Sequence, residues 1–357
     1  MIRTDARLAD GRELFYYSSS AAHDTPPDTR DLEPRSGTGE LRYDVLDGDW
    51  VSVAGHRQGR AFLPSTAECP LCPTTPGNLT EIPAPSFEVA VFENRYPSFQ
   101  DPRGSAPTPE RLHAVGPNAG RCEVICFSDD HDASFADLDP SRIRLVLDAL
   151  ADRTTALLEL PYVAHVFPFE NCGEEIGVTI RHPHGQVYGY PFVPPRALAR
   201  LTAAQRHAES TGRSLVRDVV DSELADGSRV VAETEHWVAF VPFAARWPFQ
   251  LQVNPRRDVL DLPGLDDAER DDLAVLQRDL LRRLHGLFGV RMPYIAGWFQ
   301  APKGVLREHA RLHLEIVSNR RAPGKLKYLA GSESAMGAWI NDIRPEDAAR
   351  MLREVVL

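Results

Sequence analysis

Two histidines and a glutamine stand at alternate positions in the stretch RHPHGQVYGY, residues 181–190. The proline between the histidines argues against a helix, and a residue before proline is driven toward extended backbone. Because valine and tyrosine follow, 181–188 is predicted to be extended, near a sheet edge. Alternate side chains of a strand share one face, so His182, His184 and Gln186 form one polar row. Such a row can supply a nucleophile, a metal ligand and a fixed hydrogen-bond donor.

The same row has a simpler interpretation, which is the polar outer face of a half-solvated strand. That interpretation suits a single histidine better than the full pattern His-Pro-His-Gly-Gln. Gly185 has no side chain, and we interpret it as room for a ligand to approach closely.

The stretch ECPLCP places Cys69 and Cys72 in C-x₂-C spacing. That spacing suits two thiolates on one tetrahedral zinc, although a pair of structural cysteines fits it too. Two more ligands would be needed, and His131 and His182 are candidates. A Cys₂His₂ set would be a closed, structural site with no open position for substrate.

Several other segments carry weaker signals. GHRQGR supplies Arg57 and Arg60, which a solvated charge cluster would also explain. The turns ENR at 93–95 and ENCGEEIGVT at 170–179 are able to wrap a ligand. The run KLKYLAGSESAMGAW at 325–339 is poorly periodic and indicates a binding loop.

The elements that must position these residues occur twice. In each half, two strand-like segments precede a helix and two more strands, with helices predicted at about 140–158 and 267–288. The sequence PYVA follows the first predicted helix and opens the two strands after it. PYIA follows the second predicted helix in the same way. The repeat predicts an α+β fold of two related domains from an internal duplication, with antiparallel sheets and packed helices. The second half lacks the His-x-His-x-Gln pattern.

Composition divides the chain further. Residues 1–40 are predicted to be a flexible N-terminal arm, because 18–40 are rich in Pro, Ser and Gly. The first domain is expected over 41–195 and the second over 196–357, with Pro194 and Pro195 at the boundary. Residues 101–120 are predicted to form a long surface loop.

Composition also bounds the function. The 357 residues suffice for about two domains, and the formal net charge is −11. With no basic patch, a nucleic acid is an unexpected partner, whereas a small phosphorylated substrate is compatible with a few local arginines. We expect no membrane association and a cytoplasmic location, because no apolar run is long enough to span a bilayer and no secretory signal is evident. Five cysteines without a signal favour reduced thiols.

The motifs together resemble galactose-1-phosphate uridylyltransferase, a branch of the histidine-triad superfamily. C-x₂-C, SDDH, FEN with a glycine turn, and HPHGQ followed by PFVPP carry the resemblance, which covers about Arg42 to Trp339. It implies a zinc-containing homodimer with shared active sites that moves UMP from UDP-glucose to galactose-1-phosphate through a covalent uridylyl-histidine.

The resemblance also implies roles for individual residues. His184 would be the nucleophile, and Gln186 would hold the uridylyl phosphate. Cys69, Cys72, His131 and His182 would bind one structural zinc. The backbone carbonyl of Asn171 would orient the nucleophilic imidazole. The remaining substrate contacts would be Arg57, Arg60, Asn94, Arg95, Asn171, Gly177, Val178 and Thr179, with Lys327, Tyr328, Ser332 and Glu333 contributed to the sugar end by the partner subunit.

The chain departs from the family pattern at several positions. Where some members hold a second metal with one Glu and three His, this chain has Arg200, Phe299, His313 and Glu315. Three of these four do not match, so no second metal is predicted. Trp339 stands where a sugar-contacting glutamine is expected, and Arg95 where an acidic residue is common.

Two other functions remain open. A sister transferase or phosphorylase acting on ADP-glucose or a dinucleoside polyphosphate would share the same chemistry. A zinc-stabilised nucleotide-binding regulator would share the fold without turnover, although the His184–Gln186 pair favours an enzyme.

Overall fold

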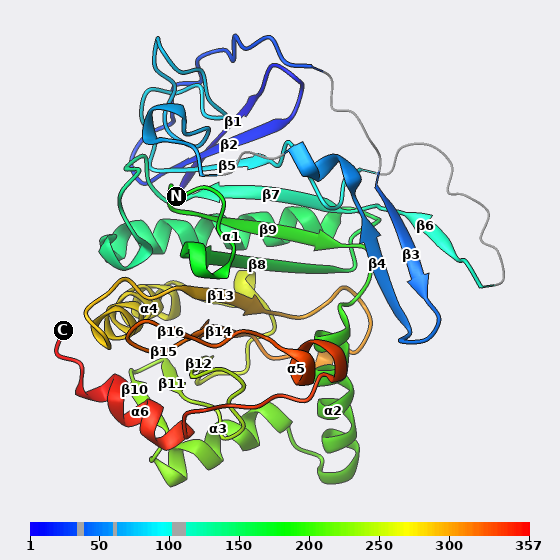
Figure 1. Ribbon diagram of the computed structural model, residues 1–357, viewed down its shortest axis with the longest axis vertical. Helices are drawn as coiled ribbons and strands as arrows, with labels where there is room; N and C mark the ends of the chain where they lie inside the picture. Colours follow the sequence, from blue (N-terminus) through cyan, green and yellow to red (C-terminus); the bar gives the residue numbers. More distant parts are fainter. Residues whose placement is uncertain (34–38, 60–62, 102–111) are drawn as a thin grey trace.

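The computed structural model describes residues 1–33, 39–59, 63–101 and 112–357. An antiparallel sheet of 11 strands extends across both halves of the chain, in the order β1-β2-β5-β7-β9-β8-β13-β14-β12-β11-β10 (Figure 1). Its strands are β1 Ile2–Arg7, β2 Glu13–Ser18, β5 Val89–Glu93, β7 Arg121–Cys126, β8 His165–Cys172, β9 His184–Tyr190, β10 Val230–Glu233, β11 Trp237–Phe240, β12 Phe249–Pro255, β13 Tyr294–Phe299 and β14 His313–Ser318.

Two smaller sheets and six helices complete the described part of the chain. One small sheet joins β3 Glu40–Asp44, β4 Asp49–Val53 and β6 Val115–Pro117, and the other joins β15 Arg320–Ala322 and β16 Lys325–Leu326. The helices are α1 Pro140–Glu159, α2 Pro195–Thr211, α3 Leu215–Asp226, α4 Asp267–Gly286, α5 Gly331–Met336 and α6 Pro345–Glu354.

The predicted repeat is present in the sheet. Read outward from the junction of β8 with β13, the first half runs β8-β9-β7-β5 and the second half runs β13-β14-β12-β11. Helix α1 lies between β7 and β8 in sequence, and α4 lies between β12 and β13. The two halves therefore have the same order and meet edge to edge. The domain boundary at 195 stays a prediction, because the sheet itself runs on across the junction.

The two predicted long helices are α1 and α4, and they pack against each other. Pro140 occupies the first turn of α1, where its missing N–H is no loss, and Asp266 with Glu269 forms the predicted capping box of α4. One face of each helix joins the main core, which also contains Ile125 of β7 and Val187 of β9. Because side chains alternate along a strand, His184 and Gln186 point to the opposite face of the sheet from Val187.

The predicted flexible arm over residues 1–40 is wrong for its first half. β1 and β2 pair with each other, and β2 pairs with β5, so residues 2–18 are the outermost strands of the main sheet. The reason is burial: Leu14, Phe15, Tyr16 and Tyr17 of β2 are all at most 4% exposed.

Within the described residues no helix is long and apolar enough to span a bilayer.

Candidate active site and metal centre

The four predicted metal ligands come together. The donor atoms of Cys69, Cys72, His131 and His182 all lie within 4.8 Å of one another. The Cys72 Sγ atom lies 3.3 Å from Nδ1 of His131 and 3.5 Å from Nδ1 of His182. Two thiols and two imidazole nitrogens at this spacing fit a tetrahedral metal with no open position.

His182 is oriented by the main chain behind it. Its Nε2 atom lies 2.8 Å from the carbonyl oxygen of Ser128, which only accepts a hydrogen bond, so Nε2 carries the proton and Nδ1 is available to a metal. Metal-bound imidazoles are commonly fixed by a second bond of this kind. The side chain is fully buried, and it borders the second of the two cavities described below but not the first.

β9 begins at His184, three residues later than the extended segment was predicted to begin, directly after a proline that has no N–H for the ladder. The Nδ1 atom of His184 lies 2.7 Å from the carbonyl oxygen of His182. That oxygen can only accept, so Nδ1 is protonated and Nε2 keeps its lone pair. Burial lowers the pKa of His184, and the bond to the carbonyl opposes this. The imidazole is therefore held in the neutral tautomer that a nucleophile requires.

This contact corrects one expectation. The carbonyl that orients His184 belongs to His182 and not to Asn171. Asn171 lies on β8, beyond the Glu170–Gly185 pair of the ladder, and lines a cavity together with His184.

A cavity of about 510 Å³ brings together six of the predicted site residues, from segments far apart in sequence. They are His184, Gln186, Arg57, Asn94, Arg95 and Thr179. Arg57 lies in a 3₁₀ turn at Gly55–Gly59, and its Nη1 atom donates to the carbonyl of Tyr96 over 2.6 Å. Asn94 accepts from the backbone N–H of Tyr96 at 2.8 Å, which shapes the turn after β5. Arg60 lies outside the described residues.

A second cavity of about 550 Å³ shares His184. Asn171 and Val178 line it, and Arg181 and Arg291 supply positive charge. Gly177 ends the short turn 174–176 in the left-handed conformation (φ 86°), which a side chain would strain. The segment 171–179 therefore wraps the space beside the nucleophile, and Thr179 at its end lines the first cavity.

A buried carboxyl lies on the other face of the same strands. Glu170 is 8% exposed, and Tyr294 donates to its Oε1 atom over 2.8 Å. Burial raises the pKa of Glu170 to about 8, while the hydrogen bond from Tyr294 opposes the shift. Glu170 is therefore mostly a neutral acid at pH 7.

The interpretation of Gly185 as space for a ligand is wrong. A Cβ atom at this position would lie 2.8 Å from Cζ of Phe127 and 2.9 Å from the carbonyl oxygen of Phe169. Both atoms belong to the protein core. Glycine is required here because β8 and a core phenylalanine approach the catalytic strand too closely for a side chain.

The predicted sugar-end residues lie apart from His184 within this chain. Neither cavity that contains His184 is lined by Lys327, Tyr328, Ser332 or Glu333. Lys327 is buried and pairs with Glu333 at 2.8 Å, whereas Tyr328 is 72% exposed. Trp339 also lies away from both cavities and packs against Trp247.

The four residues at the expected second-metal positions do gather, but they do not fit a metal. The guanidinium of Arg200 donates to Nε2 of His313 over 2.6 Å and also bonds to Glu315. Phe299 stacks on His313 with ring centroids 5.0 Å apart. A guanidinium is always cationic here and a phenyl ring has no ligand atom, so the cluster is an ion pair on an aromatic stack.

Comparisons with known proteins agree with this geometry. The family model described as galactose-1-phosphate uridyl transferase, N-terminal domain, matches residues 32–194, and the C-terminal domain model of the same family matches 201–356. The chain belongs to this family. The galactose-1-phosphate uridylyltransferase of Streptomyces lividans is 43% identical, covering 99% of this chain and 98% of that protein.

Two further relatives extend the comparison. The galactose-1-phosphate uridylyltransferase of Thermotoga maritima is 34% identical over 88% of this chain and 98% of its own length. A solved structure titled as that of a uridylyltransferase is 34% identical, with a TM-score of 0.81 over 88% of this chain and 98% of that chain.

Sequence reasoning missed the other residues that line the first cavity, including three from the N-terminal half of the first domain model and the segment before it. Arg30, Leu32 and Glu81 line it beside the predicted set. Arg30 and Leu32 fall in a polar, proline-rich segment with no periodic pattern, so no local signal marks them.

Proposed function

We propose that this enzyme carries the uridylyl group on Nε2 of His184 during turnover. Membership of the family makes it a UDP-glucose–hexose-1-phosphate uridylyltransferase. The observation that supports a covalent route is the bond from Nδ1 of His184 to the His182 carbonyl, which leaves Nε2 unprotonated beside Gln186 in one cavity.

The reaction then proceeds in two displacements. Nε2 of His184 attacks the α-phosphorus of UDP-glucose, an N–P bond forms, and the bond to the bridging oxygen breaks to release glucose-1-phosphate. A phosphate oxygen of galactose-1-phosphate next attacks the same phosphorus, the N–P bond breaks, and UDP-galactose leaves. One difficult transfer becomes two easier ones through a shared intermediate.

Gln186 and the cationic side chains serve the phosphoryl group. Gln186 follows two residues after His184 on the same face, so its amide N–H groups are placed to bind the equatorial oxygens. Arg57 lines the same cavity and supplies positive charge. A neutral amide suffices because the acceptor, a phosphate, brings no proton that must be removed at the transition state.

We assign the Cys₂His₂ cluster to one structural zinc per chain. Zinc favours this donor set. When bound, it would tie the Cys69–Cys72 loop and the His131 turn to the residues that precede β9. It would thereby fix His184 without entering the chemistry.

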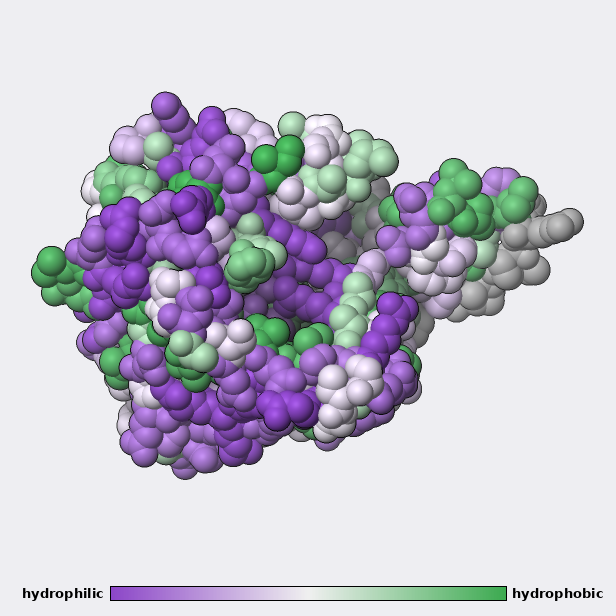
Figure 2. Space-filling model, turned by 90° about the horizontal axis from the view of Figure 1, so that it is seen from below, coloured by the Kyte–Doolittle hydropathy of each residue, from purple (hydrophilic) through white to green (hydrophobic). Residues whose placement is uncertain are grey.

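We also propose a homodimer in which a partner subunit completes the sugar end with Lys327, Tyr328, Ser332 and Glu333. Two observations support it. These residues lie outside the cavities of their own chain, and apolar side chains stand exposed on the projecting β3–β4 hairpin, including Leu46, Trp50 and Val51 (Figure 2). Its partners are then UDP-glucose, galactose-1-phosphate and a second copy, in the cytoplasm.

An exchange experiment tests this function. Labelled glucose-1-phosphate should enter UDP-glucose without any galactose-1-phosphate present, because the first displacement is reversible and independent of the second substrate. His184→Ala should abolish the exchange. If exchange requires galactose-1-phosphate, the two-step route is wrong.

A further inference from the structure

The first cavity extends across neighbouring strands of the main sheet. Phe92 of β5, Val124 of β7 and Gln186 of β9 are direct partners across adjacent strands, and all three line the cavity. Neighbouring strands are about 4.8 Å apart, so Phe92 lies roughly 10 Å from the reactive end at Gln186. A nucleotide joined to His184 therefore extends along this row, with its base toward β5.

The N-terminal segment lies at the far end of that row. Leu14 of β2 is the next partner after Phe92, and the chain that follows β2 returns to the cavity with Arg30 and Leu32. Together with Glu81, they line the cavity, and Arg12 joins Glu81 to the carbonyl of Glu93, the last residue of β5. The family model begins at residue 32, so Arg30 precedes the part of the chain that the model describes.

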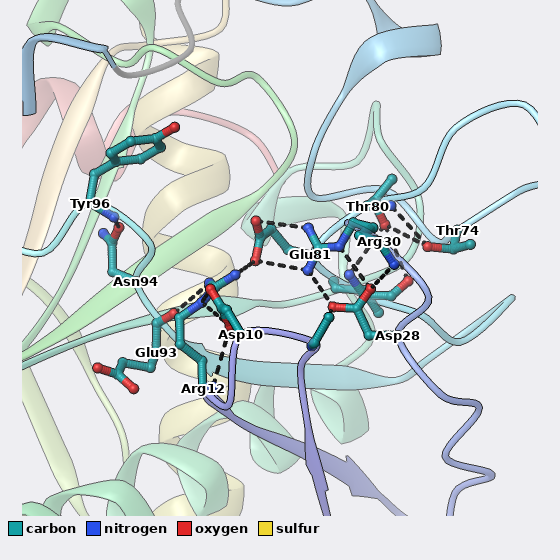
Figure 3. A network of polar contacts seen from close by, with 12 residues as sticks. Asp10, Arg12, Asp28, Arg30, Thr74, Thr80, Glu81, Glu93, Asn94 and Tyr96 are labelled. Atoms are coloured by element: carbon teal, nitrogen blue, oxygen red, sulfur yellow. Dashed lines mark hydrogen bonds and ion pairs between the residues drawn. The ribbon is translucent and has the colours of Figure 1, made fainter. Parts of the chain in front are cut away.

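Arg30 is held rigidly between two carboxylates (Figure 3). Its Nε and Nη2 atoms bond to the two oxygens of Asp28 at 2.9 and 2.7 Å, and its Nη1 atom bonds to Glu81 at 2.9 Å. The side chain is only 10% exposed. A guanidinium neutralised on two sides is poorly suited to phosphate, and Arg57 already serves the reactive end. Arg30 therefore forms a fixed boundary of the cavity, which we call the wall.

The carboxylate between the arginines is fixed as well. Glu81 forms an ion pair with Nη2 of Arg12, with 2.6 Å between the two atoms, and Nη1 of Arg12 donates to the carbonyl of Glu93 at 2.9 Å. Asp28 in turn accepts from the backbone N–H of Ala9 at 2.9 Å. These contacts tie the wall to β5 and to the β1–β2 turn, so a larger ligand cannot push it aside without breaking buried ion pairs.

We infer that Arg30 is a specificity-determining residue for the nucleobase, and that it limits the donor to a pyrimidine nucleotide. The inference rests on the proposed function. A purine extends farther than a pyrimidine by one fused ring, and the wall stands where that ring would lie. The hydrogen bonds to Asp28 and Glu81 use four of the five N–H groups of Arg30 among the described residues, and the fifth, on Nη1, is a donor that a carbonyl oxygen of uracil can accept.

The test compares donors in matched variants. Initial rates with UDP-glucose and with ADP-glucose are measured for the wild type, Arg30→Ala and Arg7→Ala. Arg7 is an exposed arginine of the same segment that contacts Gly11 and lies away from the cavity. In Arg30→Ala, the ratio of kcat/KM for UDP-glucose to that for ADP-glucose should fall by about tenfold, mostly through KM. Arg7→Ala should keep the wild-type ratio.

A second variant separates a change in donor preference from a general loss of folded structure. Arg30→Ala leaves Glu81 with one partner fewer, so Arg30→Ala combined with Glu81→Gln removes both charges and opens the same space. A general loss of structure would lower the rates of both donors alike and leave their ratio unchanged. An unchanged ratio in both variants would overturn the inference.

The outcome also separates this inference from the proposed function. A wild-type enzyme that takes no uridylyl group from UDP-glucose contradicts the proposed function. A wild type that takes it, with a donor ratio insensitive to Arg30, contradicts only the assignment of the wall.

Discussion

Replacing Gly185 with alanine should distort the catalytic strand, because the new Cβ atom would collide with two neighbouring groups. The new Cβ atom would lie 2.9 Å from the carbonyl oxygen of Phe169, which belongs to the β8 backbone, and 2.8 Å from Cζ of Phe127. Contacts this short force β8 and β9 apart, since the interior is close-packed. Overpacking of this kind costs about 1–3 kcal/mol of folding free energy, or roughly 2–10 °C in melting temperature for a protein of this size.

The same displacement should reach the chemistry, because His184 and Gln186 flank the substituted position. A misplacement of 1 Å can slow a positioned reaction about 10²-fold, so a shift of several tenths of an ångström should slow uridylylation of His184 by about tenfold. Thermal unfolding and single-turnover labelling with UDP-glucose measure the two effects.

Gly116→Ala is the matched control, since its Cβ would make only ordinary contacts, at 3.7 Å from Trp50 and 3.9 Å from Leu41, in the separate sheet of β6. Its free energy of unfolding should lie within about 1 kcal/mol of the wild-type value, and UDP-glucose should label His184 at the wild-type rate. If Gly185→Ala behaves like this control, the packing argument for the glycine is refuted.

Three other predictions probe the site independently. Gln186→His should raise hydrolysis of the uridylyl intermediate relative to transfer, because an imidazolium can donate a proton where the amide cannot; equal ratios of UMP to UDP-galactose would contradict this. His182→Ala or Cys69→Ser should lower zinc content and melting temperature together, while His184→Ala should keep its zinc; elemental analysis showing the reverse would exchange the two histidines' roles. Glu170→Gln should gain melting temperature over the wild type as pH rises from about 4.5 to about 8, because the native state keeps a proton that the unfolded chain releases, and a difference constant with pH would oppose this.

His182 could be named as a candidate metal ligand from the residues themselves, whereas the role of His184 as nucleophile came from the family resemblance and stays a prediction. The strand period and the proline place His182 and His184 at successive positions of one extended segment, and the C-x₂-C pair requires additional ligands. The structure brings one histidine to the cysteines and the other to the cavity. The repeat was also predictable, because each half repeats its own order of strands and helix.

Other features depend on contacts that no local pattern encodes. Arg30 pairs with Glu81, 51 positions later in the chain, and it acquires a place in the cavity only through the fold. The need for glycine at 185 comes from Phe127 and from the neighbouring strand. The wrong prediction for residues 2–18 had a different origin, since the apolar run LFYY of β2 is a strand signal that the charged, polar start of the chain outweighed.

The most direct test of the account is the mass of the intact protein after mixing with UDP-glucose alone. The account predicts that the wild type gains the mass of one UMP and that fragmentation places it on His184. The His184→Ala variant should gain nothing while keeping its melting temperature and its metal. A UMP adduct that persists in His184→Ala, or a wild type that turns over with no adduct at any time, would contradict the assignment of His184 as the nucleophile.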